Sequence, residues 1–232
     1  CVLVANIIAV AAHVRAEQLF INYSNGNTVY CLALQDDNVL WAGTLGGGVI
    51  RWDLQSGAHV KYTATDGLVY NTVQSVAVDS SGNLWCGTLG FGVSRFDGRN
   101  WTSFKQESGL FDKQVTAIGQ DFKGRMWFGT YNDYAKCYDG SDWSSVSRQD
   151  GLSDNNIHDI ERDGKGGLWF ATSRGVSRLD SSGWTTITTR DGLANRAVAE
   201  IYSDRDGILW FASMADNYGK EAVSRYDGVT WK

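Results

Sequence analysis

Four residues whose side chains could together perform acid–base or metal chemistry lie in two short stretches of this sequence. His158, Asp159 and Glu161 fall within IHDIER, and Glu200 falls within VAEIYS. Carboxylates beside an imidazole could bind a metal ion or act as a general acid and base. Alternatively, the same residues could be ordinary solvated polar side chains that line a water-filled channel. Because no further motif supports the acidic pair, the sequence favours this second interpretation.

Recognised catalytic motifs are absent from the sequence. It contains no G-x-S-x-G, no H-E-x-x-H and no P-loop pattern, so the usual signatures of hydrolases, zincins and nucleotide-binding proteins are missing. We therefore predict no catalytic residue, no metal ion and no cofactor for this region. The formal net charge is −5 and no run of Lys or Arg occurs, which argues against a nucleic-acid partner.

The elements that would position such residues are set by an internal repeat. A tryptophan follows a DxxGxL-type turn in five successive units, with spacings of 44, 42, 42 and 41 residues, at Trp41, Trp85, Trp127, Trp169 and Trp210. A Gly-Leu pair and a Leu or aromatic residue followed by Asp recur in step with it. Three markers that keep the same period identify a repeat architecture.

Each unit is predicted to contain four short strands. In the second unit these are residues 73–78, 84–88, 92–96 and 101–104, separated by turns rich in Gly and Asp. No segment has helical spacing of apolar residues. Four strands in about 42 residues are typical of a β-propeller blade, in which the repeated tryptophan would fill the space between neighbouring blades.

We therefore predict an all-β protein made of four-stranded antiparallel blades. The propeller would occupy residues 17–232, with repeats at approximately 20–63, 64–105, 106–147, 148–189 and 190–232. The Gly and Asp residues between strands are interpreted as turn residues that supply the positive φ angles of hairpins.

Variable loops on one face of the blades are the predicted recognition surface, because loops on a rigid scaffold usually carry binding. The candidate ligand-binding residues are Tyr70, Asn71, Phe91, Phe111, Lys113, Tyr131, Asn155, Arg174 and Arg196. Aromatic faces would stack on a sugar, and amides and cations would bind its hydroxyl or acidic groups. Taken singly, each is also compatible with an ordinary loop or packing residue. Asn71 and Asn155 recur at one repeat position, which is also typical of side chains that cap the backbone.

The fullest unit, DGLVYNTVQSVAVDSSGNLWCGTLGFGVSRFDGRNW (66–101), resembles the repeat of the two-component regulator propeller family. The resemblance extends over about residues 20–232. It rests mainly on structural residues, so it implies the fold more strongly than the function.

The resemblance implies a sensor. Propellers of this family are periplasmic input regions of bacterial hybrid histidine kinases, many of which respond to glycans. It therefore implies a ligand-sensing region that binds an oligosaccharide or another small ligand, with self-association or a second propeller as partner. Such propellers usually have about seven blades, followed by a transmembrane helix and a kinase.

Two interpretations of the blade number remain open. In the first, which we favour, the chain is a piece of a longer sensor and its five units belong to a larger propeller. In the second, five blades close on themselves. LFINY (19–23) would then supply the outer strand that completes the last blade.

The first residues resemble the second half of a secretory signal peptide. An apolar run from Val2 to Ala12 is followed by small residues that end at Ala16. We expect a truncated signal peptide at residues 1–16 and a periplasmic or extracellular protein, membrane-anchored in its full-length form. A transmembrane anchor is the alternative, but the run is shorter than the ~20 residues that span a bilayer.

Three cysteines follow this segment: Cys31, Cys86 and Cys137. They are odd in number and occupy different positions in their repeats, which argues against a disulfide framework. We expect small buried side chains.

Three classes of function fit these observations. The leading one is a ligand-sensing propeller. A structural or protein-recruiting platform is the second, because propellers often serve as scaffolds. A secreted lyase or glycosidase is the third, and it would depend on Asp159, Glu200 and His158.

Overall fold

The structure is a computed structural model that describes residues 28–105, 114–131, 133–215 and 219–232. The chain divides into two compact units, Cys1–Lys105 and Gln106–Lys232. The expected signal segment 1–16 and the segment 19–23 lie outside the described residues. Within the described ranges, no helix has the length and apolar character needed to cross a membrane.

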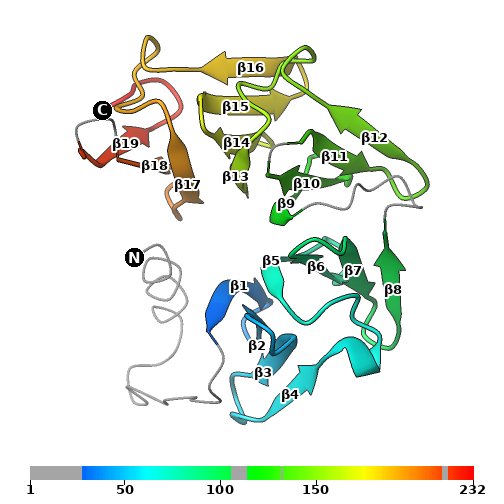
Figure 1. Cartoon of the computed structure of the whole chain (residues 1–232). Coiled ribbons are helices and arrows are strands. Elements are labelled where there is room, and N and C mark those ends of the chain that lie inside the picture. Colours follow the sequence, from blue (N-terminus) through cyan, green and yellow to red (C-terminus); the bar gives the residue numbers. More distant parts are fainter. Residues whose placement is uncertain (1–27, 106–113, 132, 216–218) are drawn as a thin grey trace. The chain divides into compact units, whose positions relative to one another are not determined.

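The first unit contains two four-stranded antiparallel blades (Figure 1). Its strands are β1 (Val29–Gln35), β2 (Val39–Thr44), β3 (Val49–Asp53), β4 (His59–Tyr62), β5 (Val73–Val78), β6 (Leu84–Thr88), β7 (Val93–Phe96) and β8 (Trp101–Phe104). A short 3₁₀ helix, η1 (Ala64–Asp66), lies between β4 and β5. The four strands predicted for the second repeat agree with β5 to β8 to within one residue.

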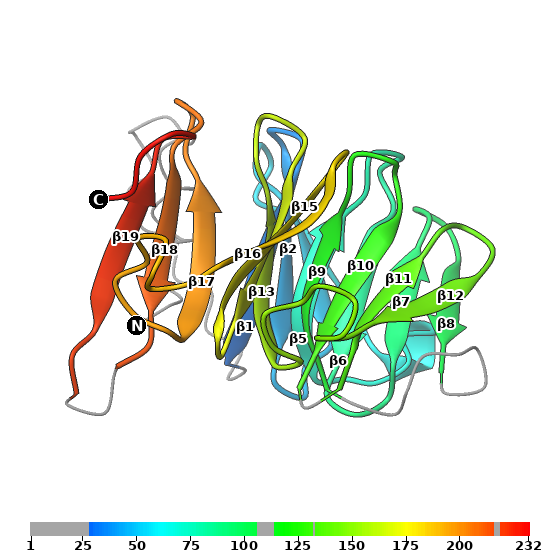
Figure 2. The same cartoon turned by 90° about the horizontal axis from the view of Figure 1, so that it is seen from above.

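The second unit contains three blades. Its strands are β9 (Val115–Gln120), β10 (Met126–Thr130), β11 (Ala135–Tyr138), β12 (Trp143–Val146), β13 (Ile157–Arg162), β14 (Leu168–Thr172), β15 (Gly175–Asp180), β16 (Gly183–Ile187), β17 (Val198–Ser203), β18 (Leu209–Ser213) and β19 (Ala222–Tyr226). The strands β17 to β19 form a sheet of their own (Figure 2), and an isolated bridge joins Tyr226 to Trp231. The first strand of each blade lies on the inner side of the unit, and β12 and β16 lie on its outer side (Figure 1).

The chain is thus all-β and is built from five β-propeller blades, as the repeat predicts. Within each blade the strands follow one another in sequence order, so each turn joins neighbouring antiparallel strands. Such a meander leaves two broad faces that must be covered by other blades.

The turn between the first and second strand is held by an aspartate that also binds the repeated tryptophan. Asp79 Oδ1 accepts the backbone N–H groups of Ser81 and Asn83, and its Oδ2 accepts the indole N–H of Trp85 at 2.8 Å. The same indole bond recurs at 2.8–2.9 Å in the later blades, in the pairs Asp121–Trp127, Asp163–Trp169 and Asp204–Trp210. Burying an indole requires a partner for its N–H, and this aspartate supplies one.

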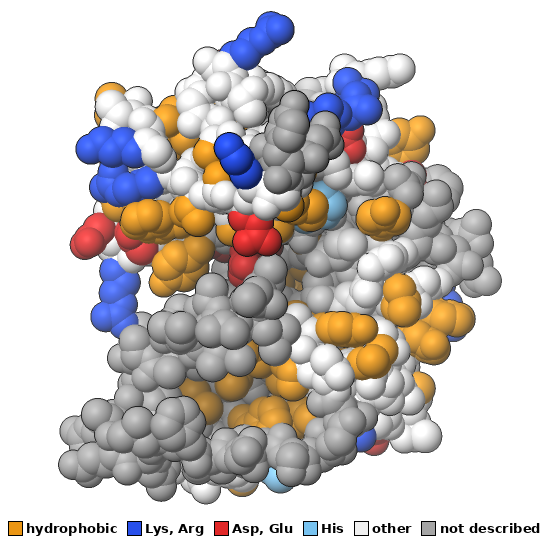
Figure 3. Space-filling view, turned by 60° about the vertical axis from the view of Figure 1, so that its left-hand side comes forward, with side chains coloured by type: hydrophobic (Ala, Val, Ile, Leu, Met, Phe, Trp, Pro, Cys, Tyr) orange, Lys and Arg blue, Asp and Glu red, His pale blue; other side chains and the backbone are white. Residues whose placement is uncertain are grey.

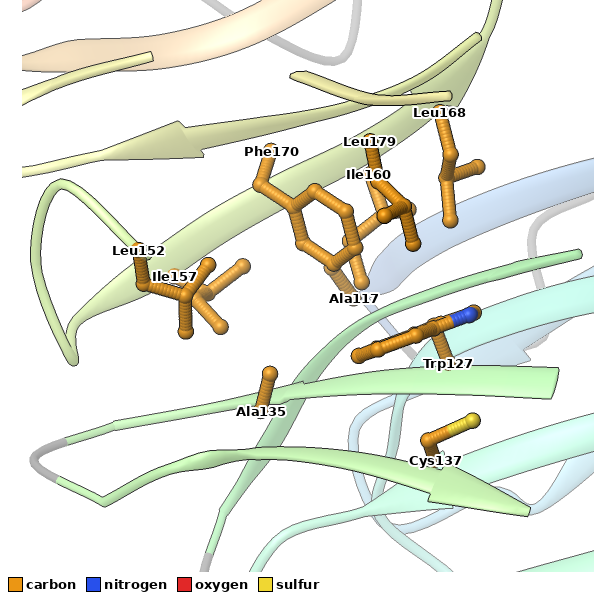
Figure 4. Packing of buried hydrophobic residues seen from close by; sticks show 10 residues of the cluster. All are labelled: Ala117, Trp127, Ala135, Cys137, Leu152, Ile157, Ile160, Leu168, Phe170 and Leu179. Carbon is orange, nitrogen blue, oxygen red and sulfur yellow. The ribbon is translucent and has the colours of Figure 1, made fainter. Parts of the chain in front are cut away.

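Hydrophobic packing between adjacent blades forms the core of the second unit. Trp127 of β10 is 2% exposed and meets the ring of Phe170 in β14 edge to face, with centroids 5.5 Å apart (Figure 4). Ile160 of β13 belongs to the same cluster. A Cβ at Gly119 would lie 2.4 Å from Cγ2 of Ile160, so the glycine allows the inner strands to approach closely. The tryptophan therefore fills the space between blades, as predicted.

A comparable core lies between the two blades of the first unit. Trp41 of β2 contacts Phe96 of β7 with ring centroids 6.1 Å apart, and Tyr62 packs between Phe96 and Trp101. Valine and leucine side chains from β3, β5 and β6 complete the cluster.

Cys31, Cys86 and Cys137 are free thiols. Cys86 and Cys137 are buried, as the sequence predicts, whereas Cys31 is half-buried. Burial raises the pKa of Cys31 to about 12 and that of Cys137 to about 11.

Candidate functional site

The acidic residues singled out in the sequence come together on the inner strands β13 and β17. Asp159 accepts the backbone N–H of Ile160 through Oδ1 and that of Ile201 through Oδ2, each at 2.8 Å. Glu161 Oε1 accepts the N–H of Ser203 at 3.2 Å. Both carboxyl groups of β13 therefore bind the backbone of the next blade. They hold two blades together.

Glu200 of β17 completes this group, which we call the three-carboxylate cluster: Asp159, Glu161 and Glu200. Burial raises the pKa of Asp159 to about 6. Burial, and next the charge of Asp159, raise the pKa of Glu161 to about 8 and that of Glu200 to about 7. Near neutral pH the cluster holds protons that exposed carboxyl groups would have released. It can store a proton or act as a weak general acid.

His158 does not join the three-carboxylate cluster. The pairing of β13 with β14 shifts between Ile157 and Asp159, so His158 is the extra residue of a β-bulge. Its Nε2 lies 2.9 Å from Oγ of Ser173. Burial lowers the pKa of His158, and Asp154 opposes that shift. Within the described residues, no group of three His, Cys, Asp or Glu side chains is placed to hold a metal ion.

A polar hollow of about 450 Å³ lies at the loops of the fourth and fifth repeats. We call it the arginine hollow; its lining residues are Arg148, Asp154, Asn155, Asn156, Ser173, Arg174 and Arg196. It brings together three of the predicted ligand-binding residues: Asn155, Arg174 and Arg196. They come from the loop before β13, the β14–β15 turn and the loop before β17.

Several residues of the arginine hollow were not among the predicted ligand-binding residues. Arg148, Asp154, Asn156 and Ser173 line it as well. A signal for Asp154 was present, because its repeat position is the one that Tyr70 occupies in the second repeat. For Arg148 and Ser173 the sequence offered no comparable signal.

The predicted residues of the first unit form a separate group. The rings of Tyr70 and Phe91 stack with centroids 4.1 Å apart, and they are 36% and 49% exposed. Asn71 Oδ1 accepts the backbone N–H of Ala64 at 2.7 Å. Asn155 Oδ1 similarly accepts the N–H of Arg148 at 3.2 Å. Both asparagines therefore make the backbone contact that their shared repeat position suggested.

Of the remaining predicted residues, the structure describes Tyr131, which lies in neither group. Tyr131 follows β10 and is exposed, and its backbone N–H donates to the carbonyl of Gln114. Phe111 and Lys113 lie outside the described residues. Among the described residues on the face in Figure 3, basic side chains are scattered between hydrophobic and neutral ones rather than joined into a stripe.

The repeats match a known family model. Residues 67–90, 109–132 and 151–174 match the family described as two component regulator propeller. Each match runs from the Gly-Leu pair to the turn after the second strand. No match is found among the curated proteins.

Solved structures share the fold. The chain is similar to the extracellular domain of a putative hybrid two component system from B. thetaiotaomicron, with 24% identity and a TM-score of 0.74 over 90% of this chain and 29% of that one. It is similar to virginiamycin B lyase from Staphylococcus aureus, with 16% identity and a TM-score of 0.65 over 90% and 73% of the two chains. It is also similar to PorZ, a surface component of the type-IX secretion system of Porphyromonas gingivalis, with 15% identity and a TM-score of 0.61 over 84% and 32%.

Proposed function

We propose that the chain, three of whose repeats match the two component regulator propeller model, is the extracytoplasmic ligand-sensing region of a two-component receptor of the hybrid histidine kinase type. The observation that carries this proposal is the match of three consecutive repeats to that family. The likeness to the extracellular domain of a hybrid two component system supports it. In this proposal the chain itself binds and does not catalyse, and its five blades form part of a larger propeller.

The proposed ligand is a glycan. Tyr70 and Phe91 present exposed aromatic rings, which suit the apolar face of a sugar. The arginine hollow presents amide and guanidinium donors to hydroxyl or acidic groups. Binding would change the packing between propellers or subunits and so pass the signal on.

A transcript comparison tests the sensor proposal. Cells with the intact gene and cells in which it is deleted are grown on single purified glycans. A sensor predicts that one glycan induces a set of genes in the first strain and fails to do so in the second. Equal induction in both strains on every glycan would contradict the proposal.

Export is part of the same proposal. The apolar run before Ala16 supports a secretory signal, and the likeness to the extracellular domain of a hybrid two component system supports a periplasmic or extracellular location. Fusing the chain to alkaline phosphatase, which is active only after export, tests it. Active enzyme is expected when the fusion is made from the gene with its own start codon and residues 1–16, and not when the exported part starts at Glu17.

A lyase is the second candidate function. The three-carboxylate cluster retains protons near neutral pH, and virginiamycin B lyase has a similar fold. However, two of the carboxyl groups already bind the backbone of the next blade, which favours a structural role. Lyase activity that falls at least tenfold in Glu200→Gln would favour the enzyme.

A further inference from the structure

The arginine hollow is positively charged although the chain is acidic. Three arginines and one aspartate line it, which gives a local formal charge of +2, whereas the whole chain has −5. A concave site lined by charges of one sign concentrates counter-ions there. Its volume of about 450 Å³ lies in the usual range for small-molecule sites.

The carboxylate in the hollow is already occupied by protein donors. Asp154 Oδ1 accepts the backbone N–H of Asn156 at 3.0 Å, and its Oδ2 lies 3.1 Å from Nε of Arg174. Asp154 is buried, whereas the side chain of Arg174 is 49% exposed. The ion pair through Nε therefore orients the guanidinium, and its two terminal amino groups make no hydrogen bond with a described residue.

The other two arginines of the hollow make fewer side-chain interactions than Arg174. The guanidinium groups of Arg148 and Arg196 make no hydrogen bond or ion pair with any residue that the structure describes. Asn155 uses Oδ1 for the N–H of Arg148, so its amide N–H₂ is the part left to meet a ligand. The hollow thus offers a surplus of donors, and its carboxylate acceptors are satisfied internally.

We propose that the arginine hollow binds the oxyanion of an acidic ligand, a carboxylate or sulfate group carried on an oligosaccharide. A donor-rich site is complementary to acceptors, and an anion also relieves the repulsion between the arginines. Arg174, fixed by Asp154, provides the oriented fork, and Arg196 adds charge from the next repeat. This assignment rests on the proposed ligand-sensing function and narrows its ligand to the acidic class.

Titration calorimetry with three probes tests the assignment. The probes are trigalacturonate, the same trisaccharide fully methyl-esterified, and sodium sulfate, each added to the whole chain and to Arg196→Gln and Arg174→Gln. Arg99→Gln is the matched control, because it removes one exposed guanidinium from a turn of the first unit and gives the same net charge.

Binding of trigalacturonate that weakens at least about tenfold in Arg196→Gln and in Arg174→Gln, but not in Arg99→Gln, is expected. It should also weaken when NaCl is raised. If sulfate binding also weakens in Arg196→Gln and Arg174→Gln but not in Arg99→Gln, the oxyanion alone is sufficient for binding and the assignment is supported. Equal affinity for the acidic and esterified trisaccharides, or equal loss in all three variants, would overturn the assignment. Arginine-independent binding of the esterified trisaccharide would do so as well, while leaving the sensor proposal standing.

Discussion

Asp154 and Arg174 form an ion pair at the two repeat positions where Tyr70 and Phe91 stack in the other unit. In one case a carboxylate oxygen lies 3.1 Å from a guanidinium nitrogen, and in the other two ring centroids lie 4.1 Å apart. The first position precedes the inner strand of a blade, and the second lies in the turn between its second and third strands. This pair of positions therefore joins the two loops in which the sequence predicts recognition, with different chemistry in different blades.

The aromatic pair should be energetically coupled. In a double-mutant cycle of Tyr70→Ala and Phe91→Ala, we expect a coupling free energy of about 0.5–1.5 kcal/mol, because stacked rings interact beyond their buried area. Urea unfolding of the two single variants and the double variant measures it. If the losses in free energy of unfolding of the two single variants add up to that of the double variant, the two rings have no coupling free energy.

Replacing a repeated tryptophan with alanine should greatly lower the free energy of unfolding only where that tryptophan packs between two blades. Trp127→Ala should lower the free energy of unfolding by about 3–5 kcal/mol, because it empties the space beside Phe170. The control is Trp210→Ala at the equivalent position, which is 39% exposed in the structure and should cost clearly less. Equal losses in the two variants would contradict this explanation of the core.

Stability should depend on pH through Glu161. Burial raises its pKa from 4.5 to about 8, so between these values the folded chain keeps a proton that the unfolded chain has lost. The stabilisation is complete below pH 4.5 and is lost as the pH rises toward 8. Glu161→Gln keeps the acceptor for the Ser203 N–H but cannot ionise. Its free energy of unfolding should fall less than that of the wild type from pH 5 to 8.5, by roughly 1–3 kcal/mol.

Denaturant titrations at several pH values measure this difference. Glu221→Gln, which changes an exposed carboxyl group, is the control and should follow the wild type. Parallel curves for Glu161→Gln and the wild type would show that Glu161 does not titrate with a raised pKa.

The three free thiols should be unreactive in the folded protein. Burial raises the pKa values of Cys31, Cys86 and Cys137, so few thiolates exist at pH 8. In a Cys1→Ser background, iodoacetamide should modify none of them before unfolding and all three in urea, as read by mass spectrometry. Rapid modification of any one in native buffer would contradict their burial.

The repeat period explains why the blades could be predicted from the sequence. Each blade is a local meander whose strands follow one another, so turn residues and strand propensities specify it without distant information. The Asp79–Trp85 bond shows the limit of that reasoning. The sequence predicts that the aspartate is a turn residue, and the structure adds that its second oxygen binds the indole six residues further on.

The candidate site is harder to predict from the sequence than the blades are. The sequence indicates Asn155, Arg174 and Arg196 because they lie in the variable loops of one blade face, but each comes from a different loop. Only packing of the fourth blade against the fifth brings them to one hollow. Pairing between blades depends on contacts about 42 residues apart, which a local pattern does not specify.

The sequence by itself determined the number of repeats, the strands within them and the all-β class, because these follow from period, propensity and turn chemistry. Tertiary structure decided which face of β13 carries the carboxylates. Ile157 and Ile160 both enter one core although strict alternation would put them on opposite faces. The β-bulge at His158 shifts the alternation by one residue, and this turns Asp159 and Glu161 toward the backbone of β17.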